Sequence, residues 1–189
     1  MLQIRIHGRG GQGVVTAAEL LSMAAFWDGK FALAFPSFGS ERMGAPVAAY
    51  CRISAQVVRV REPIVAPDVI IVQDSTLLRQ VDVFGGLSPQ GFVLINSTRT
   101  SEELGIEERC SSLREQHWCI LPATDIAIKH LQRPLPNAGL IAALAALTQE
   151  VSLASIEKAI QEKFPGSVGY RNIEVAREAY DYVASHVPV

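Results

Sequence analysis

The chain has 189 residues, of which 49% are hydrophobic and 19% are charged. A globular chain of this length buries about 70% of its unfolded surface, so a sizeable core is expected. With a net charge of −2 and no dense basic stripe, the sequence argues against nucleic acid and anionic membranes as partners. Its apolar runs are too short to cross a membrane and a strand is expected from the first residues, without a signal peptide, so we expect a cytoplasmic protein.

The low share of charged residues has two explanations. A large α/β core built on continuous apolar strands would account for it. An apolar surface that lies against a partner subunit would account for it equally well. Composition alone leaves both explanations open.

The N-terminal residues predict a strand, a glycine turn and a helix in succession. Residues 2–7 alternate apolar and polar side chains, residues 8–13 read GRGGQG, and residues 14–27 are rich in Ala and Leu. A second strand is expected at residues 30–35. The loop that follows, residues 36–46, contains two prolines and two glycines, and a loop of this length and mixed chemistry suggests a functional role.

The next segments predict more strands. Residues 47–53 and 56–60 are candidate strands of one hairpin, although the two-residue link between them is not a strong hairpin turn. Residues 69–72 are a near-continuous β-branched run, which is typical of a central strand covered on both faces. A helix is expected from Ser75 to about Phe84, with Ser75 as its cap.

The remainder of the chain continues to alternate strands and helices. Two further strands are expected at residues 91–96 and 118–122, separated by the polar stretch 101–116. This alternation predicts an α/β fold: a Rossmann-like three-layer α/β/α sandwich with a mostly parallel, mixed sheet, in which residues 47–60 supply antiparallel strands. We expect a single domain over residues 1–189. The last third predicts helices at residues 123–130, 137–148, 153–164 and 172–186.

Neither the cysteines nor the histidines have the spacing of a metal site. Cys51, Cys110 and Cys119 match neither paired zinc ligands nor the closely spaced thiolates of an iron–sulfur cluster, so we expect buried, inert thiols. The histidines are scattered without an HxxxH pair, and no GxSxG nucleophile motif occurs. We therefore expect no metal ligands and no catalytic residues in this chain.

The glycine-rich segment at residues 8–13 has the GxGxxG spacing. Between a strand and a helix, this spacing can present backbone amides to a phosphate at the helix N-terminus. The expected second strand lacks the acid that reads a ribose, which disfavours direct NAD binding. Two interpretations stay open: glycines that only allow a tight turn and close packing, or a loop that faces a cofactor held mainly by another chain.

The long loop contains a second candidate site. Glu41 and Arg42 are adjacent charges flanked by Ser37, Gly39 and Gly44. Adjacent charges in a loop are commonly a solvated pair. The flanking small residues equally fit a loop that contacts an anion.

Two segments carry a family resemblance, GRGGQGVVTAAELL and FPSFGSERMGAPVAAYCRIS. Together they resemble the gamma-chain, or domain III, signature of pyruvate:ferredoxin and 2-oxoglutarate:ferredoxin oxidoreductases. The similarity continues through residues 67–71, 91–96 and 137–141 and ends near residues 170–172, so it covers about the whole chain. Related indolepyruvate enzymes usually differ from PSFGxERxGAPV in the loop after the second strand, so that branch fits less well.

The resemblance implies a subunit of an enzyme that oxidatively decarboxylates pyruvate or 2-oxoglutarate to an acyl-CoA and passes the electrons to ferredoxin. It implies alpha, beta and delta partner subunits that hold thiamine diphosphate, Mg2+ and 4Fe-4S clusters, while this chain alone binds none and is inactive. By similarity, the two loops face those subunits and help to bind coenzyme A. The residues expected at that site are Gly8, Gly10, Gly11, Gln12, Gly13, Ser37, Gly39, Glu41 and Arg42.

One residue departs from the family pattern, and two other functions stay open. Met43 stands where many relatives have a second basic residue, which lowers the expected charge of the loop and suits interface packing. The alternatives are a stand-alone nucleotide-binding module and a purely structural interaction subunit. A free nucleotide binder should carry a ribose-reading acid or a Walker lysine, and the chain has neither.

Overall fold

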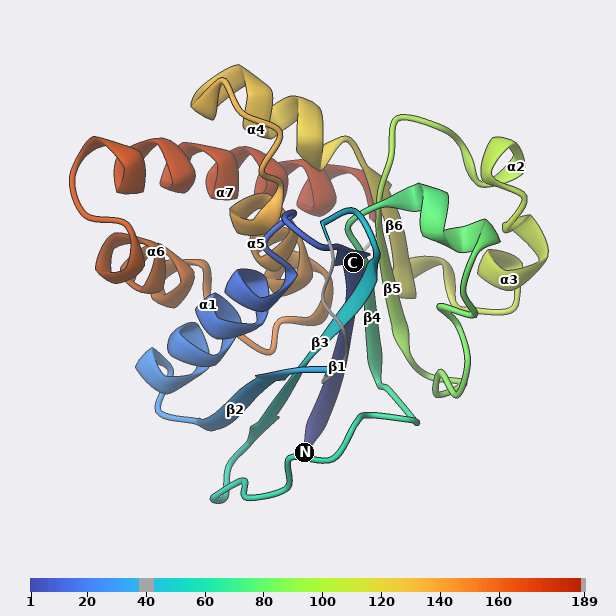
Figure 1. The fold of residues 1–189 in the computed structure, drawn as a ribbon, viewed down its shortest axis with the longest axis horizontal. Helices are drawn as coiled ribbons and strands as arrows, with labels where there is room; N and C mark the ends of the chain where they lie inside the picture. Colours follow the sequence, from blue (N-terminus) through green and yellow to red (C-terminus); the bar gives the residue numbers. More distant parts are fainter. Residues whose placement is uncertain (38–42, 188–189) are drawn as a thin grey trace.

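The structure, a computed structural model, describes residues 1–37 and 43–187. Its centre is a six-stranded sheet in the order β2-β3-β1-β4-β5-β6 (Figure 1). β1, β4, β5 and β6 pair in parallel, whereas β3 is antiparallel to both β1 and β2. The predicted mixed, mostly parallel sheet is therefore confirmed. The strands are β1 (Leu2–Arg9), β2 (Phe31–Pro36), β3 (Pro46–Ser54), β4 (Val69–Val72), β5 (Phe92–Asn96) and β6 (Trp118–Leu121).

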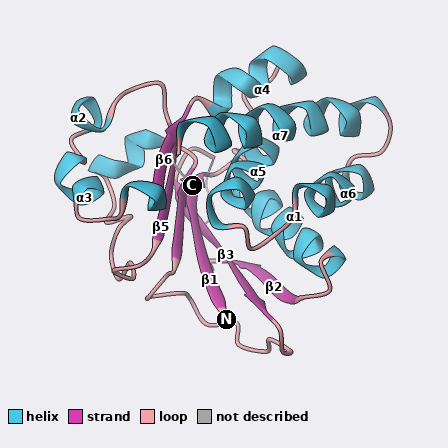
Figure 2. Ribbon diagram, turned by 180° about the vertical axis from the view of Figure 1, so that it is seen from behind, coloured by secondary structure: helices cyan, strands magenta, loops and turns pink. Residues whose placement is uncertain are grey.

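Helices cover both faces of the sheet, as the predicted α/β fold requires (Figure 2). In β4, Val69 and Ile71 belong to one apolar core and Ile70 and Val72 to the other. This alternation explains the β-branched run of that strand, because both of its faces are buried. The helical segments are α1 (Val14–Trp27), η1 (Ser75–Arg79), α2 (Ser101–Leu104), α3 (Glu107–Ser111), η2 (Glu115–His117), α4 (Ala123–Leu131), α5 (Asn137–Thr148), α6 (Leu153–Lys163) and α7 (Ser167–His186).

The helices are divided unequally between the two faces of the sheet. Helices α1, α4, α5, α6 and α7 stand together on one side of the sheet, and α2 and α3 lie on the other (Figures 1 and 2). The small residues of α5 are almost all buried, which lets this helix pack closely against α7 and α1. Within the described residues, none of the helices is both long and apolar enough to cross a membrane.

The predicted hairpin of residues 47–53 and 56–60 is wrong in its second half. Residues 47–53 lie in β3, whereas residues 56–60 belong to no strand of the described structure. Both edges of β3 are already paired, one with β1 and the other with β2, which leaves no free edge for another strand. The segment instead runs outside the sheet, where the carbonyl of Val60 accepts a hydrogen bond from Arg52 Nη1 at 2.9 Å.

The helix predicted from Ser75 to Phe84 is only a short 3-10 helix, η1 (Ser75–Arg79), and its cap is Asp74, whose side chain accepts from the Thr76 amide, rather than Ser75. Arg5 in β1 is 9% exposed, and its Nη2 donates to the carbonyls of Val83 and Gly85 at 3.1 and 2.6 Å. A buried cation needs acceptors for its donors. After η1 the chain follows an irregular path that supplies these acceptors.

The last helix starts earlier than predicted, at Ser167 rather than at residue 172. Gly169 lies so close to the end of α6 that a Cβ there would be 2.0 Å from the carbonyl oxygen of Phe164. Only glycine allows this approach, and it lets α7 begin directly after the turn from α6. The other C-terminal helices agree with prediction, and Ser152 caps α6 by accepting from the amide of Ser155.

We expect the free energy of unfolding to fall in acid through His7. Arg5 Nε donates to His7 Nε2 at 3.0 Å, and burial, together with the Arg5 charge, lowers the pKa of His7 from 6.5 to about 4. The folded state therefore stays neutral where the unfolded chain takes up a proton, and stability is lost as the pH falls through this window. Urea denaturation at pH 7 and pH 5 should reveal a loss of about 2 kcal/mol from this residue.

The matched variants are His7→Gln, which keeps an acceptor for Arg5, and His186→Gln at an exposed position. The first should remove about 2 kcal/mol of the pH dependence, and the second should leave it unchanged. Equal pH dependence in wild type and His7→Gln would show that another group is responsible.

Candidate functional site

The glycine-rich loop connects the end of β1 to the start of α1 (Figure 1). It lies at the edge of the sheet where the parallel strands end, which is the usual ligand crevice of open α/β sheets. Gly13 precedes α1 with a φ of 72°, in the left-handed region that favours glycine. None of the described side chains caps this end of the helix.

The loop backbone leaves some of its amides free. Gly10 donates to the carbonyl of Ala45 at 2.9 Å, and Gln12 donates to the carbonyl of Arg9 at 3.0 Å. The amides of Gly11 and Gly13 donate to none of the described residues. The geometry thus offers N–H donors at Gly11 and Gly13, whereas the backbone amides of Gly10 and Gln12 are used within the protein.

Asp74, which lies just beyond β4, holds the glycine loop in place. Its Oδ2 accepts from Arg9 Nε at 3.1 Å and from Gln12 Nε2 at 2.8 Å. Burial alone would raise the pKa of this carboxyl, but hydrogen bonds from Thr76 and Gln12 and the charge of Arg9 hold the pKa below its ordinary value. The Gln12 side chain is therefore turned into the protein, where its Oε1 also accepts from the Arg9 amide at 2.8 Å.

Arg9 joins the glycine loop to the end of the long loop. Its Nη1 donates to the carbonyl of Gly44 at 2.9 Å, and the Gly44 amide donates to the carbonyl of Gly10 at 3.0 Å. Met43 lies against Gly11, where a Cβ would be 2.6 Å from the Met43 Cε. The glycine loop and residues 43–46 therefore form one continuous surface.

The structure places the remaining predicted residues as follows. Gly8 lies in β1, where a Cβ would be 2.5 Å from Val14 Cγ2, so it permits close packing of α1 on the strand. The amide of Ser37 donates to the carbonyl of Ala48 at 2.8 Å, which extends the pairing of β2 with β3. Gly39, Glu41 and Arg42 lie outside the described residues.

Sequence reasoning missed two buried amides beneath the glycine loop. Gln73 and Asn137 are 3% and 8% exposed, and Gln73 Nε2 donates to Asn137 Oδ1 at 2.9 Å. Asn137 Nδ2 lies only 2.3 Å from the place of a Cβ on Gly13. For Asn137 the sequence did contain a signal, because this polar residue starts the mostly apolar segment of α5. A buried amide is costly unless it is hydrogen-bonded, so its position there indicates a specific partner.

A polar hollow of about 310 Å³ opens beside Asp74, over the ends of β4, β5 and β6. Asn96 Nδ2 donates to Thr124 Oγ1 at 2.7 Å, so part of its lining is already hydrogen-bonded. Arg99 and Asp125 also line it and form no ion pair with a described residue. The hollow and the glycine loop share Gln12, and together they can accommodate a polar ligand.

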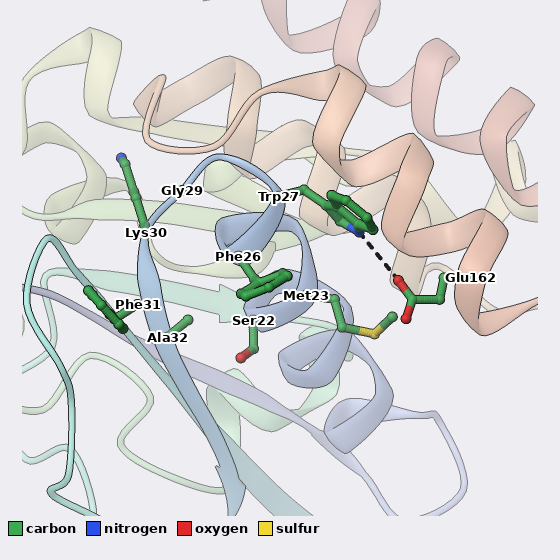
Figure 3. A pocket seen from close by; sticks show the side chains of 9 residues that line it. All are labelled: Ser22, Met23, Phe26, Trp27, Gly29, Lys30, Phe31, Ala32 and Glu162. Atoms are coloured by element: carbon green, nitrogen blue, oxygen red, sulfur yellow. Dashed lines mark hydrogen bonds between the residues drawn. The ribbon is translucent and has the colours of Figure 1, made fainter.

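A larger hollow of about 650 Å³ lies at the other end of α1 (Figure 3). Phe26 and Phe31 line it and are 70% and 48% exposed. Trp27 Nε1 donates to Glu162 at 3.3 Å, as the figure shows. Lys30 is already paired with a carboxylate at 2.9 Å. This hollow has the character of an apolar contact surface, rather than of a site with convergent reactive groups.

The three cysteines do not fit a cluster site. Burial raises the pKa of Cys51 to about 12 and the pKa values of Cys110 and Cys119 to about 11. Iron–sulfur clusters are held by thiolates gathered around one point, and these thiols lie separately in β3, α3 and β6. Among the described residues, no three His, Cys, Asp or Glu side chains come together as candidate metal ligands.

Comparison with known proteins shows the family. The sequence model of the family described as pyruvate ferredoxin/flavodoxin oxidoreductase matches residues 3–182. The chain is 44% identical over 181 residues to the common gamma subunit of the pyruvate/ketoisovalerate oxidoreductases of Pyrococcus furiosus, with 96% of each chain covered. It is 46% identical over 183 residues to the PorC subunit of pyruvate synthase of Methanothermobacter marburgensis, with 96% of this chain and 97% of the relative covered.

Solved structures agree with this assignment. The pyruvate oxidoreductase subunit PORC of Thermotoga maritima superposes with a TM-score of 0.79 at 35% identity, over 95% of both chains. A chain of the 2-oxoglutarate:ferredoxin oxidoreductase of Magnetococcus marinus shares the fold, with a TM-score of 0.75 at 17% identity over 99% of this chain and 31% of that one. The chain therefore belongs to the pyruvate ferredoxin/flavodoxin oxidoreductase family. Within it, the chain is a gamma subunit of a 2-oxoacid:ferredoxin oxidoreductase complex, as the two sequence motifs predicted.

Gly13 and Gly29 form a matched pair for testing the support of the loop. Both have a positive φ, of 72° and 73°, but a Cβ on Gly29 would meet nothing within 4 Å. Gly29→Ala should therefore cost only the left-handed strain, about 1 kcal/mol. Gly13→Ala also forces a methyl group onto Asn137, which should add about 1–3 kcal/mol. Urea denaturation of the two variants measures the difference, and equal losses would contradict a rigid contact with Asn137.

Proposed function

We propose that this chain is the gamma subunit of an enzyme that oxidatively decarboxylates pyruvate to an acyl-CoA and passes the electrons to ferredoxin, and that it supports assembly and lines the coenzyme A site. The support for pyruvate is that the two relatives described above are both named for pyruvate, the first as a subunit common to pyruvate and ketoisovalerate oxidoreductases. 2-Oxoglutarate is the second candidate, because the structural neighbour that acts on it shares this fold. The resemblance disfavours a stand-alone nucleotide-binding module and a purely structural subunit.

In this proposal the chain works in the cytoplasm as one domain of residues 1–189, beside alpha, beta and delta-type subunits. When bound in those subunits, thiamine diphosphate with Mg2+ supplies the decarboxylation chemistry and 4Fe-4S clusters carry the electrons to ferredoxin. The donor set of this chain does not fit a 4Fe-4S cluster, since its three cysteines are buried thiols in separate elements. Its own contribution is binding and positioning.

The observation that carries the coenzyme A proposal is the continuous surface formed by the glycine loop and residues 43–46. The free amides of Gly11 and Gly13 lie at the N-terminus of α1, where the helix dipole favours an anion such as a phosphate. Arg9 is already paired with Asp74, so we assign the pairing cation to Arg42. Gly8, Gly10 and Gln12 shape this surface, and Ser37, Gly39 and Glu41 complete the proposed site.

Arg42→Ala in the assembled enzyme should raise the KM for coenzyme A by about tenfold or more, because a charged hydrogen bond contributes roughly 1.5–3 kcal/mol. The KM for pyruvate should stay the same, since that substrate reacts in the neighbouring subunits. Steady-state reduction of ferredoxin at varied coenzyme A measures both constants. Arg114→Ala, at an exposed position, is the matched control. An unchanged KM for coenzyme A in an intact complex would remove Arg42 from the site.

The support for an assembly role is the aromatic edge, which we define as Phe26, Trp27 and Phe31. These side chains are 70%, 46% and 48% exposed, and they lie together around one hollow (Figure 3). Phe31 is the first residue of β2, an edge strand of sequence FALAFP that lacks the charged residues that usually protect a free edge. We assign this surface to a neighbouring subunit of the same oxidoreductase.

Affinity purification of the tagged chain should recover a thiamine-binding subunit and an iron–sulfur subunit. The purified complex should be most active on pyruvate when assayed against pyruvate, 2-oxoglutarate and aromatic 2-oxoacids. Phe26→Ser with Phe31→Ser should lower this recovery at least tenfold, because truncated interface aromatics commonly cost more than 2 kcal/mol each. The isolated variant should keep its circular dichroism and its unfolding midpoint.

Ile128→Ser is the control for that double variant, because Ile128 is 48% exposed and lies on α4. Its recovery of partners should match wild type. A lone monomer that binds nucleotide would overturn the proposed function. Full assembly of the double variant would overturn only the role of the aromatic edge.

A further inference from the structure

A cavity of about 310 Å³ lies where the ends of four helices meet. We call it the helix-end cavity. Leu131 ends α4, Asn137 begins α5, Phe164 follows α6, and Val168 lies in the first turn of α7. These four helices stand on the same side of the sheet (Figure 1). The volume suits a small molecule, at the lower end of the usual range for ligand pockets.

One side of the helix-end cavity is apolar, and the other is lined by two asparagines, Asn137 and Asn172. Asn172 is 8% exposed, and its Nδ2 donates to the carbonyl of Val168 at 2.9 Å, while its Oδ1 accepts from none of the described residues. Asn137 begins α5, and the first three amides of that helix donate to no described residue. These groups line the cavity and are free to hydrogen-bond a ligand there. Asn172 Oδ1 remains accessible to solvent, since the fully buried side-chain atoms that lack a partner among the described residues are Gln73 Oε1 and His117 Nδ1.

Two arginines from different elements line the same cavity. Arg133 lies in the connection between α4 and α5, and Arg171 lies in α7. Neither forms an ion pair with a described acid, whereas Arg177, further along α7, is paired with Glu157 at 2.6 Å. A guanidinium group presents planar donors that match the two oxygens of a carboxylate. The two guanidinium groups that line the cavity therefore favour an anionic ligand.

We propose that the helix-end cavity binds a small carboxylate with an apolar tail. The carboxylate lies between Arg133 and Arg171, and the tail packs against Leu131, Leu135 and Phe164. The free amides at the start of α5 add positive potential at the same place.

The cavity is connected to the glycine loop through one side chain. Asn137 lines the cavity and also accepts a hydrogen bond from Gln73 while contacting Gly13. A ligand in the helix-end cavity therefore touches the residue that supports the loop. This inference goes beyond the proposed function and does not depend on it, because it concerns binding to this chain alone.

Isothermal titration calorimetry of the full chain tests the proposal with hexanoate and phenylacetate as probes. Acetate supplies the charged head alone, and 1-hexanol supplies the tail alone. We expect at least one of the two probes to bind with a stoichiometry of one and at least tenfold more tightly than acetate or hexanol. Absence of binding by both probes would overturn the proposal.

Three variants distinguish this cavity from other binding surfaces. Arg133→Gln with Arg171→Gln should weaken binding at least tenfold, while Arg114→Gln, also at an exposed position, should leave it unchanged. Val168→Trp should fill the cavity and abolish binding, and it should fold normally because Val168 is 54% exposed. Unaltered affinity in the double arginine variant, or binding that survives Val168→Trp, would place the ligand elsewhere and overturn the proposal.

Discussion

The carboxylate of Asp74 orders the surface on which the proposed coenzyme A site depends. It binds Arg9, 65 residues away in the chain, and the same arginine reaches the carbonyl of Gly44. The side chains of this pair are only 20% and 16% exposed, so loss of the carboxylate would leave partly buried donors without an acceptor. Gln12 is held by the same oxygen. The glycine loop therefore has a defined shape without a ligand, which lowers the cost of ordering it on binding.

Helix α1 connects two surfaces of different chemistry. Its N-terminus follows Gly13 and offers unpaired amides, and its C-terminus carries Phe26 and Trp27 at an apolar hollow. Under the proposed function, a subunit docked at the aromatic edge would also fix the position of the glycine loop, because one helix joins the two surfaces. This arrangement fits the contribution that we propose for the chain, which is to position a loop within the complex.

The parts of the fold that were predicted correctly depend on local properties of the chain. The run at residues 69–72 is apolar at every position because β4 is buried on both faces, and the small-residue segment 137–148 is α5 as expected. The errors concern contacts that the local pattern of residues does not show. Residues 56–60 find no free edge of β3 to pair with, and the segment after η1 follows an irregular path whose carbonyls accept from Arg5. Helix α7 starts at Ser167 because Gly169 allows a close approach to the end of α6.

For the candidate site, too, the local features were predictable from sequence and the long-range contacts were not. The GxGxxG spacing and its position between strand and helix are local, so the sequence by itself determined the glycine loop, and the two family motifs determined the kind of subunit. Only the tertiary structure decided that Asp74, Gln73 and Asn137 support that loop. The first two are about 60 residues from the loop in the chain and Asn137 is more than 120 residues from it, so they reach the loop only once the sheet and α5 are in place. The coenzyme A contacts assigned to Arg42 stay a prediction. The physical reason for this division is that turn geometry depends on neighbouring residues, whereas a buried hydrogen-bond partner depends on the whole fold.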